Sequence, residues 1–266
     1  MARPFSVKRQ RGFTTIALVC FFLLYLPIAT LVAYAFNAGT TVAIWEGFSL
    51  RWFAAAWANT RIIDATLRSL TIAPIAASIA TVTATMAAIA MTRTAPYRGL
   101  TFKYAFINQP LMVPEIVTAV ALLVVFSHVK VWSGYSGLGY LIAAHTAFCI
   151  PFAYLPIRAR LETMDLTLER AAADLYARPW MAFRRVTLPL LWPGILAGFM
   201  LAFVVSLDDV VITEFVKSAG QDTLPTYMLG QLRREATPEM NAISTVFLGL
   251  SVAAVSLFFF LSRKKD

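Results

Sequence analysis

Residues 12–45 read GFTTIALVCFFLLYLPIATLVAYAFNAGTTVAIW, a run of 34 residues without a formal charge. About 20 apolar residues are enough for a helix to cross the ~30 Å hydrocarbon core of a bilayer. The run therefore predicts a membrane-spanning helix over about residues 13–36. A barrel strand would instead alternate polar and apolar side chains, and the continuous apolar stretch Ala17–Leu24 does not.

Five further runs have the same character: residues 69–92, 131–157, 186–207 and 240–262 carry no formal charge, and residues 104–129 carry one, Glu115. They predict helices over about residues 66–92, 104–127, 138–160, 191–216 and 241–262. Since helices satisfy their own backbone hydrogen bonds in lipid, we expect an all-α polytopic membrane bundle of six transmembrane helices. We expect residues 1–266 to form a single integral membrane domain, with its core over about residues 62–262.

The composition supports this class and excludes others. Hydrophobic residues make up 59% of the chain and charged residues 14%, with a mean hydropathy of +0.70. Soluble domains are about 45–50% apolar and 25% charged. The net charge of +9 is too scattered along the chain to indicate a nucleic-acid partner. Cys20 and Cys149 lie in apolar runs without ligand spacing, so neither a disulfide framework nor a metal site is predicted.

The basic residues predict the orientation of the bundle. If the N-terminus is cytoplasmic, 16 of the 23 Lys and Arg residues lie on the cytoplasmic side. This bias fits the positive-inside rule with both termini cytoplasmic. No cleavage site follows a short apolar core in the first helix, so we interpret it as a retained anchor.

The loop 158–190 is the least apolar part of the chain. Asp165 is a candidate N-cap for a helix to about Tyr176, and Pro179 is suited to the first turn of a second, short helix. Mostly small residues recur at helical spacing on the first helix: Leu168, Ala171, Ala172 and Leu175. Such a face allows the close approach of another protein, or lies on the membrane surface or the bundle itself.

This loop resembles the EAA loop of the permease subunits of type I ABC importers. The resemblance rests on AAADL at 171–175, ARPW at 177–180 and FRRVTLPLLWPGI at 183–195. Three more stretches resemble the C-type spermidine/putrescine permease branch: PLMVPEIV at 110–117, HTAFCIPFAYLPIRARL at 145–161, and SLDDVVITEFV at 206–216 with TLPTYMLGQLRREATPEMNAIST at 223–245.

The resemblance implies the type I ABC importer transmembrane fold and a multi-pass protein of a bacterial cytoplasmic (inner) membrane. It implies a second, homologous permease subunit, two ATPase subunits that use ATP and magnesium, and a periplasmic or extracytoplasmic solute-binding protein. The chain itself contains no nucleotide-binding GxxxxGK[ST] run. The residues implied to couple to the ATPase are Glu169, Arg170, Ala171, Ala172, Asp174, Leu175, Tyr176, Ala177 and Pro179.

Two positions depart from the family pattern. The glutamate of the family falls on Arg170, with Glu169 one place earlier, and its glycine falls on Tyr176. Glycine permits a left-handed backbone at a helix end, which tyrosine disfavours. We therefore expect either altered docking geometry of the loop or substitution by Glu169 through a slight helix rotation.

Acidic residues occur where the membrane is expected. Glu115 falls about 12 residues into the third predicted helix, Asp208 and Asp209 in the outer half of the fifth, and Glu214 near its outer end. Carboxylates facing lipid cost several kcal/mol, so we expect these side chains to face the bundle interior or water. In that position they predict an acidic path for a cation. For the Asp pair, the alternative is an N-cap at the outer boundary or an ion pair with Arg233 or Arg234.

Aromatic residues complete the predicted substrate pathway. Phe148, Phe152 and Tyr154 could contact a polyamine by cation–π and apolar interactions, or could simply pack in the bundle. His145 is expected to form an interhelical hydrogen bond rather than bind a metal. The proline pairs Pro110–Pro114 and Pro151–Pro156 predict bends, either ordinary membrane-helix bends or bends beside a moving pathway.

Together these features predict a permease subunit that forms half of the pathway for a small cationic solute, with a polyamine (spermidine or putrescine) favoured. A zwitterion such as a betaine could use the same acids and aromatics. A membrane-embedded enzyme or a non-catalytic scaffold are the competing classes. No HExxH or GxSxG run supports an enzyme.

Overall fold

The computed structural model describes residues 12–42, 44–94, 98–234 and 237–263. Across these ranges the regular structure is helical, with one isolated antiparallel bridge between Asn37 and Phe48. Six described helical segments are long and apolar enough to cross a membrane, as predicted: Phe13–Tyr34, Thr60–Thr92, Glu115–Ser133, Gly139–Thr163, Pro179–Asp208 and Pro238–Phe258.

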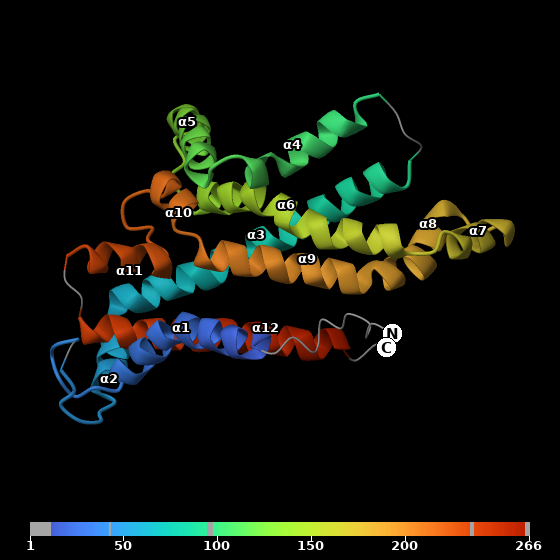
Figure 1. Ribbon diagram of the computed structural model, residues 1–266. Coiled ribbons are helices and arrows are strands. Elements are labelled where there is room, and N and C mark those ends of the chain that lie inside the picture. The colour runs from blue at the N-terminus through green and yellow to red at the C-terminus, as the bar shows by residue number, and fades with distance from the viewer. Residues whose placement is uncertain (1–11, 43, 95–97, 235–236, 264–266) are drawn as a thin grey trace, which may run out of the picture. The chain divides into compact units, whose positions relative to one another are not determined.

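The helices follow one another along the chain in the order drawn in Figure 1. Their bounds are α1 Phe13–Tyr34, α2 Arg51–Ala58, α3 Thr60–Thr92, α4 Leu100–Met112, α5 Glu115–Ser133, α6 Gly139–Thr163, α7 Thr167–Asp174, α8 Pro179–Ala182, the π-helix η2 Phe183–Thr187, α9 Leu188–Asp208, α10 Val211–Val216, α11 Leu224–Leu232 and α12 Pro238–Arg263.

The third predicted helix, 104–127, is wrong as a single element. It is two helices, α4 and α5, separated at Val113 and Pro114. Val113 has an extended backbone with φ −103° and ψ 141°, the conformation that a following proline imposes by steric clash. Glu115 is therefore the first residue of α5, not a residue in mid-helix.

The fifth predicted helix, 191–216, also divides. α9 ends at Asp208, Asp209 has an extended backbone, and α10 begins at Val211. The Asp209 carboxylate accepts hydrogen bonds from backbone N–H groups in the first turn of α10, a local contact that competes with continuation of a helix.

The second span begins at Thr60, six residues before its predicted start. Buried residues recur every three or four positions from Ile62 onward, while the charged side chains of Arg61 and Asp64 are exposed. A helix can therefore extend beyond the apolar run while its charges face outward.

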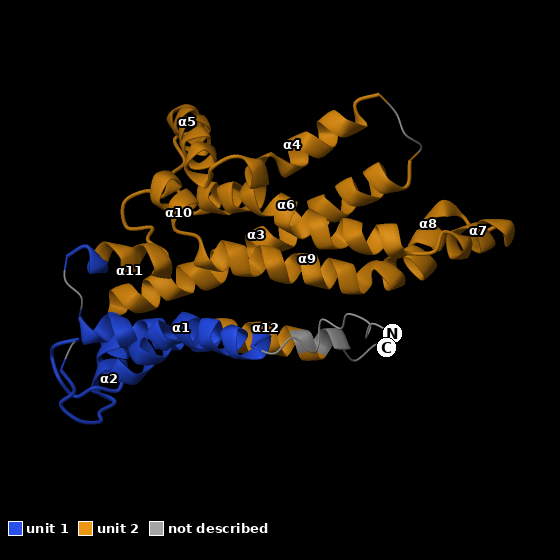
Figure 2. Ribbon diagram, in the orientation of Figure 1, with its two compact units in different colours: residues 1–59, 231–250 blue, residues 60–230, 251–266 orange. Residues whose placement is uncertain are grey.

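The chain forms two compact units, residues 1–59 with 231–250 and residues 60–230 with 251–266 (Figure 2). In the second unit, α3, α6 and α9 pack against one another and supply most of the core. The buried face of α3 is a row of alanines, including Ala73, Ala77, Ala80, Ala84 and Ala88.

A small-residue seam on α9 faces α6. It consists of Gly194, Gly198, Ala202 and Ser206, each buried and each four residues from the next. A Cβ atom on Gly198 would lie 2.6 Å from the backbone oxygen of Ala153 on α6. The two backbones thus approach as closely as small residues allow in membrane helix pairs.

In the first unit, α1 has no buried residue. Residues 35–50 connect it to the short helix α2, which the sequence did not predict. The side chain of Asn59, directly after α2, donates a 3.2 Å hydrogen bond to Glu239 at the start of α12.

Candidate functional site

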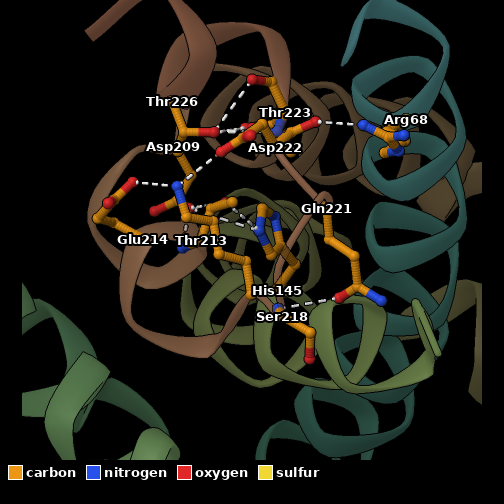
Figure 3. A network of polar contacts seen from close by, with 11 residues as sticks. Arg68, His145, Asp209, Thr213, Glu214, Ser218, Gln221, Asp222, Thr223 and Thr226 are labelled. Carbon is orange, nitrogen blue, oxygen red and sulfur yellow. Dashed lines mark hydrogen bonds and ion pairs between the residues drawn. The ribbon is translucent and has the colours of Figure 1, made fainter. Parts of the chain in front are cut away.

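The first candidate site surrounds Asp209, between α9 and α10 (Figure 3). The Asp209 side chain is buried. Its Oδ1 accepts the backbone N–H of Ile212 at 3.1 Å, and its Oδ2 accepts the backbone N–H and the hydroxyl of Thr213 at 2.9 and 2.7 Å. Asp209 therefore bonds the first turn of α10, as a capping side chain does, although the N-cap residue itself is Val210. The capping bonds account for its burial but do not test a role in transport.

His145 joins this group from α6. Its Nδ1 is 2.8 Å from the Ser206 hydroxyl on α9, and its Nε2 is 2.9 Å from the Thr213 hydroxyl on α10. Nε2 also lies 3.4 Å from Asp209 Oδ2. The predicted interhelical hydrogen bond is confirmed, and the network holds the end of α9 and the start of α10 against α6.

Two further carboxyl groups lie beside Asp209. The Glu115 side chain, from the first turn of α5, lies near enough to the Asp209 carboxylate to interact with it electrostatically. Asp208 lies close enough to Asp209 for direct charge repulsion, and it is exposed. The fold therefore brings together carboxyl groups from α5, from the end of α9 and from the α9–α10 connection. Carboxylates this close repel one another unless a proton or a cation lies between them.

Glu214 belongs to a different group of charges. It is exposed and accepts a 2.6 Å hydrogen bond from Lys217, whose Nζ also donates to Asp222 at 2.7 Å. Partial burial acts to lower the pKa of Lys217. The hydrogen bonds to Asp222 and Glu214 act in the opposite direction and outweigh it, so the pKa of Lys217 lies above its ordinary value. Glu214 thus shares with Asp222 a lysine that offsets part of their combined charge.

The turn 217–224 and the residues beside it form hydrogen bonds with several other elements of the bundle. The sequence did not predict these contacts. Arg68 on α3 donates to the Asp222 carbonyl at 3.3 Å, and Gln221 donates to the Ser136 carbonyl at 2.8 Å. Lys130 on α5 donates to the Val216 carbonyl and the Ser218 hydroxyl. The signal available in the sequence was the run KSAGQDT at 217–223, polar residues between two apolar segments.

The predicted aromatic residues pack within the bundle. The rings of Phe148 and Phe152 lie 5.3 Å apart, with Phe148 buried in the core. Tyr154 is fully buried, and its hydroxyl contacts the sulfur of Met91 at 3.7 Å. Tyr154 lies about 13 Å along α6 from His145, at 1.5 Å per residue, so it does not belong to the carboxyl group cluster.

The second candidate site is the loop 158–190. α7 occupies Thr167–Asp174 and its N-cap is Leu166, so the prediction of Asp165 as the N-cap is wrong by one residue. Asp165 Oδ1 accepts the backbone N–H of Thr167 at 2.9 Å from the position before the cap. This bond lowers the pKa of Asp165 below its ordinary value. α8 begins at Pro179, the predicted first residue of the second short helix.

The expectation that Tyr176 avoids the left-handed backbone is wrong. The residue does adopt the left-handed backbone, with φ 57°, the one positive φ among the described non-glycine residues. The N–H of Tyr176 bonds the Ala173 carbonyl and the N–H of Ala177 bonds the Ala172 carbonyl, which is the Schellman end of a helix. The loop therefore keeps the backbone that glycine favours, and tyrosine strains it by about 1 kcal/mol.

Glu169 faces inward and Arg170 is exposed. Glu169 Oε1 accepts the Thr187 hydroxyl at 3.1 Å and lies 3.3 Å from Nη2 of Arg93, which directly follows α3. Glu169 thus anchors α7 to the bundle. Arg170, on which the glutamate of the family pattern falls, lies exposed at the surface.

The outer face of the loop is apolar. Leu175 is 81% exposed and Tyr176 96% exposed, and Leu168 and Trp180 are also exposed. Ala171, Asp174 and Pro179 are exposed as well, whereas Ala172 and Ala177 are partly buried. The exposure of Leu168, Ala171 and Leu175 argues against packing of this stripe on the bundle and leaves it open to another protein or to the membrane surface.

The architecture of the chain is shared with solved membrane transport proteins. A bacterial ABC transporter involved in the import of the acidic polysaccharide alginate is similar in structure, with a TM-score of 0.68, 17% identity, and coverage of 96% of this chain and 97% of that chain. The MetNI methionine ABC transporter is similar with a TM-score of 0.63 and 19% identity over 76% of this chain and 94% of that chain. The fold is that of the transmembrane subunit of a type I ABC importer.

The chain belongs to the family of binding-protein-dependent transport system inner membrane components, whose model matches residues 101–264. It is 37% identical to the putrescine transport system permease protein PotI of Escherichia coli, over 91% of this chain and 88% of the relative. It is 36% identical to the spermidine/putrescine transport system permease protein PotC of Haemophilus influenzae, over 93% of this chain and 95% of the relative. The chain is thus a multi-pass inner-membrane transport subunit.

Proposed function

We propose that this chain is the permease subunit of an ATP-driven importer of polyamines such as putrescine and spermidine. The observation that carries the proposal is the group of carboxyl side chains Glu115, Asp208 and Asp209, brought together from separate elements. A polyamine carries several ammonium groups, and carboxylates bind them by charge-assisted hydrogen bonds. The names of the relatives PotI and PotC support the same substrate class.

The importer requires partners. A second permease subunit completes the pathway, two ATPase subunits hydrolyse ATP with magnesium, and an extracytoplasmic solute-binding protein delivers the polyamine. We place both termini in the cytoplasm, so that the exposed face of α7 and α8 meets the ATPase. Closure of the ATPase subunits then moves this loop and rocks the two permeases between inward-open and outward-open states.

The substrate is tested by uptake in proteoliposomes containing the complete complex, with labelled putrescine, spermidine and glycine betaine. Asp208 is the residue to change, because it is exposed, whereas Asp209 also caps α10. Asp208→Asn removes one charge beside the pathway and is expected to lower polyamine uptake about tenfold, equivalent to about 1.4 kcal/mol. The amount of assembled complex should not change.

Glu162→Gln is the matched control, since Glu162 is a half-exposed acid on α6 whose partner, Arg158, lies one turn away. Its uptake should equal that of the unmodified complex. Equal uptake by Asp208→Asn would contradict the acidic pathway. Transport of glycine betaine without transport of either polyamine would show that the substrate is a zwitterion and not a polyamine.

The docking face is tested by Leu175→Asp, which places a charge at an 81% exposed apolar position. We expect the ATPase subunits to be lost on co-purification while the permease remains folded. The control is Arg178→Asp, at an exposed position of the same loop that is already polar. Full ATPase retention by Leu175→Asp would contradict docking at this face.

A further inference from the structure

The connection between α1 and α2, together with α2 itself, bonds several of its backbone polar groups internally and exposes large apolar side chains. We call residues 36–42 and 44–58 the stapled loop. At its centre the Asn37 side chain is fully buried. Its Oδ1 accepts the N–H groups of Gly39 and Glu46 at 3.2 and 2.8 Å, and its Nδ2 donates to the Ile44 carbonyl at 2.6 Å. One side chain thus satisfies backbone groups on both sides of the loop.

Other polar groups of the stapled loop also bond inward. The N–H of Ala38 donates to the Gly47 carbonyl at 2.8 Å, and the N–H of Ser49 donates to the Phe36 carbonyl at 2.7 Å. The indole N–H of Trp52 donates to the Gly39 carbonyl at 3.1 Å. In water, the backbone groups that a loop exposes can bond to solvent instead. Near hydrocarbon, each unsatisfied group costs several kcal/mol.

The large apolar side chains of the stapled loop point outward. Trp57 is 81% exposed and Phe48 71% exposed, and Ile44, Trp45 and Leu50 are exposed by half or more. Phe48 stacks on Phe36 with 5.5 Å between ring centroids, and Trp45 meets Tyr34 edge to face at 6.0 Å. The aromatic rings are therefore already fixed in place, and little further entropy is lost when this surface is covered.

The position of the stapled loop indicates what covers this surface. α1 has 22 residues, so it is about 33 Å long and spans a bilayer core of ~30 Å. The stapled loop begins two residues after α1 ends, and it therefore starts at the boundary of the hydrocarbon. Tryptophan is enriched at this boundary, where its ring lies among lipid headgroups. Arg51 lies over the Trp52 ring at 4.3 Å, a cation suited to lipid phosphate.

We propose that the stapled loop is an interfacial anchor whose aromatic face is embedded in the headgroup and upper acyl region of the lipid bilayer. The occupant is phospholipid. A protein partner fits less well, because the surface directly continues a membrane span and combines tryptophan with arginine at a hydrocarbon boundary. The anchor uses none of the carboxyl groups of the proposed pathway and does not depend on the identity of the solute.

The test uses the complete complex in nanodiscs, with an environment-sensitive fluorophore on a single cysteine. Cys20→Ser and Cys149→Ala remove the native thiols, and the label is placed at Phe48→Cys. We expect its emission to shift to shorter wavelength, to be quenched by brominated phospholipid, and to be insensitive to aqueous iodide. The control is Ala219→Cys in the exposed turn after α10, where iodide should quench the label and brominated lipid should not.

The outcomes separate lipid from the other occupants. Quenching of the Phe48 label by iodide alone would overturn the anchor, because the face would then lie in water. Protection from both quenchers only after addition of the solute-binding subunit would also overturn it, in favour of a protein contact. Trp57→Ser provides an independent measurement that does not depend on labelling. The anchor predicts a smaller fraction of tryptophan emission quenched by brominated lipid, and an unchanged fraction would contradict it.

Discussion

The two ends of the α6–α9 pair use carboxylates in contrasting ways. At one end, Asp209 is buried and bonded by two backbone N–H groups, a threonine and a histidine-linked network. At the other end, Glu169 is partly exposed and holds α7 through Thr187 and Arg93. Figure 1 shows α10 at one end of α6 and α7 at the other.

The difference lies in how much water can compensate for a lost contact. A buried donor that loses its partner costs about 1–3 kcal/mol. The Glu169–Arg93 pair, with side chains 23% and 16% exposed, keeps some contact with water that offsets part of such a loss. The Asp209 end is therefore part of the folded core, while the Glu169 end can be altered with a modest effect on stability.

The largest expected effect is that of Asp209→Leu. It leaves the N–H groups of Ile212 and Thr213 without an acceptor, and we expect a loss of about 3 kcal/mol of stability. The measurement is thermal unfolding of the purified permease in detergent. Asp209→Asn keeps one oxygen acceptor and should lose less than half as much. Equal unfolding of Asp209→Leu and the unmodified chain would remove the contrast between the two ends.

The second expected effect concerns the Glu169–Arg93 pair. Glu169→Ala removes both the ion pair and the bond from Thr187, with an expected cost of about 1 kcal/mol. A double-mutant cycle with Arg93→Gln should give a coupling energy of about 0.5–1 kcal/mol. A coupling energy of zero would mean that the 3.3 Å contact does not hold α7, and that Glu169 acts through Thr187 alone.

The smallest expected effect is a stabilisation. Tyr176→Gly relieves the left-handed strain at φ 57°, and the 96% exposed tyrosine ring loses no packing. We expect a gain of about 1 kcal/mol in local stability, measured as slower amide hydrogen exchange at Ala173 through Ala177. Tyr176→Ala keeps the strain and serves as the control. Faster exchange in Tyr176→Gly would show that the tyrosine itself holds the turn.

Much of the fold could be predicted from the sequence because lipid imposes strong rules on length and charge. The six spans and the loop 158–190 followed from uncharged runs and from a resemblance. The prolines predicted a bend near Pro114 but not that one helix ends and another begins there. The break at Asp209 was not predicted, since it depends on local backbone bonds. The acidic residues were found as single positions, but their meeting depends on how α5 and α10 pack, which no spacing encodes.

The aromatic residues were harder to place, because a ring inside a membrane bundle has the same sequence pattern whether it packs or binds. Tyr154 lies in the core beside Met91, away from the carboxyl groups. The inward bonds of Asn37 left no trace in the sequence beyond one asparagine after an apolar helix.

The seam of small residues on α9 has a mechanical consequence. Because Gly198 brings the backbone of α9 against that of α6, no layer of flexible side chains separates the two helices to absorb a displacement. We therefore expect the two helices to move together when α7 is displaced. The chain is interrupted at Val113 and Asp209, and the carboxyl groups lie at these two interruptions.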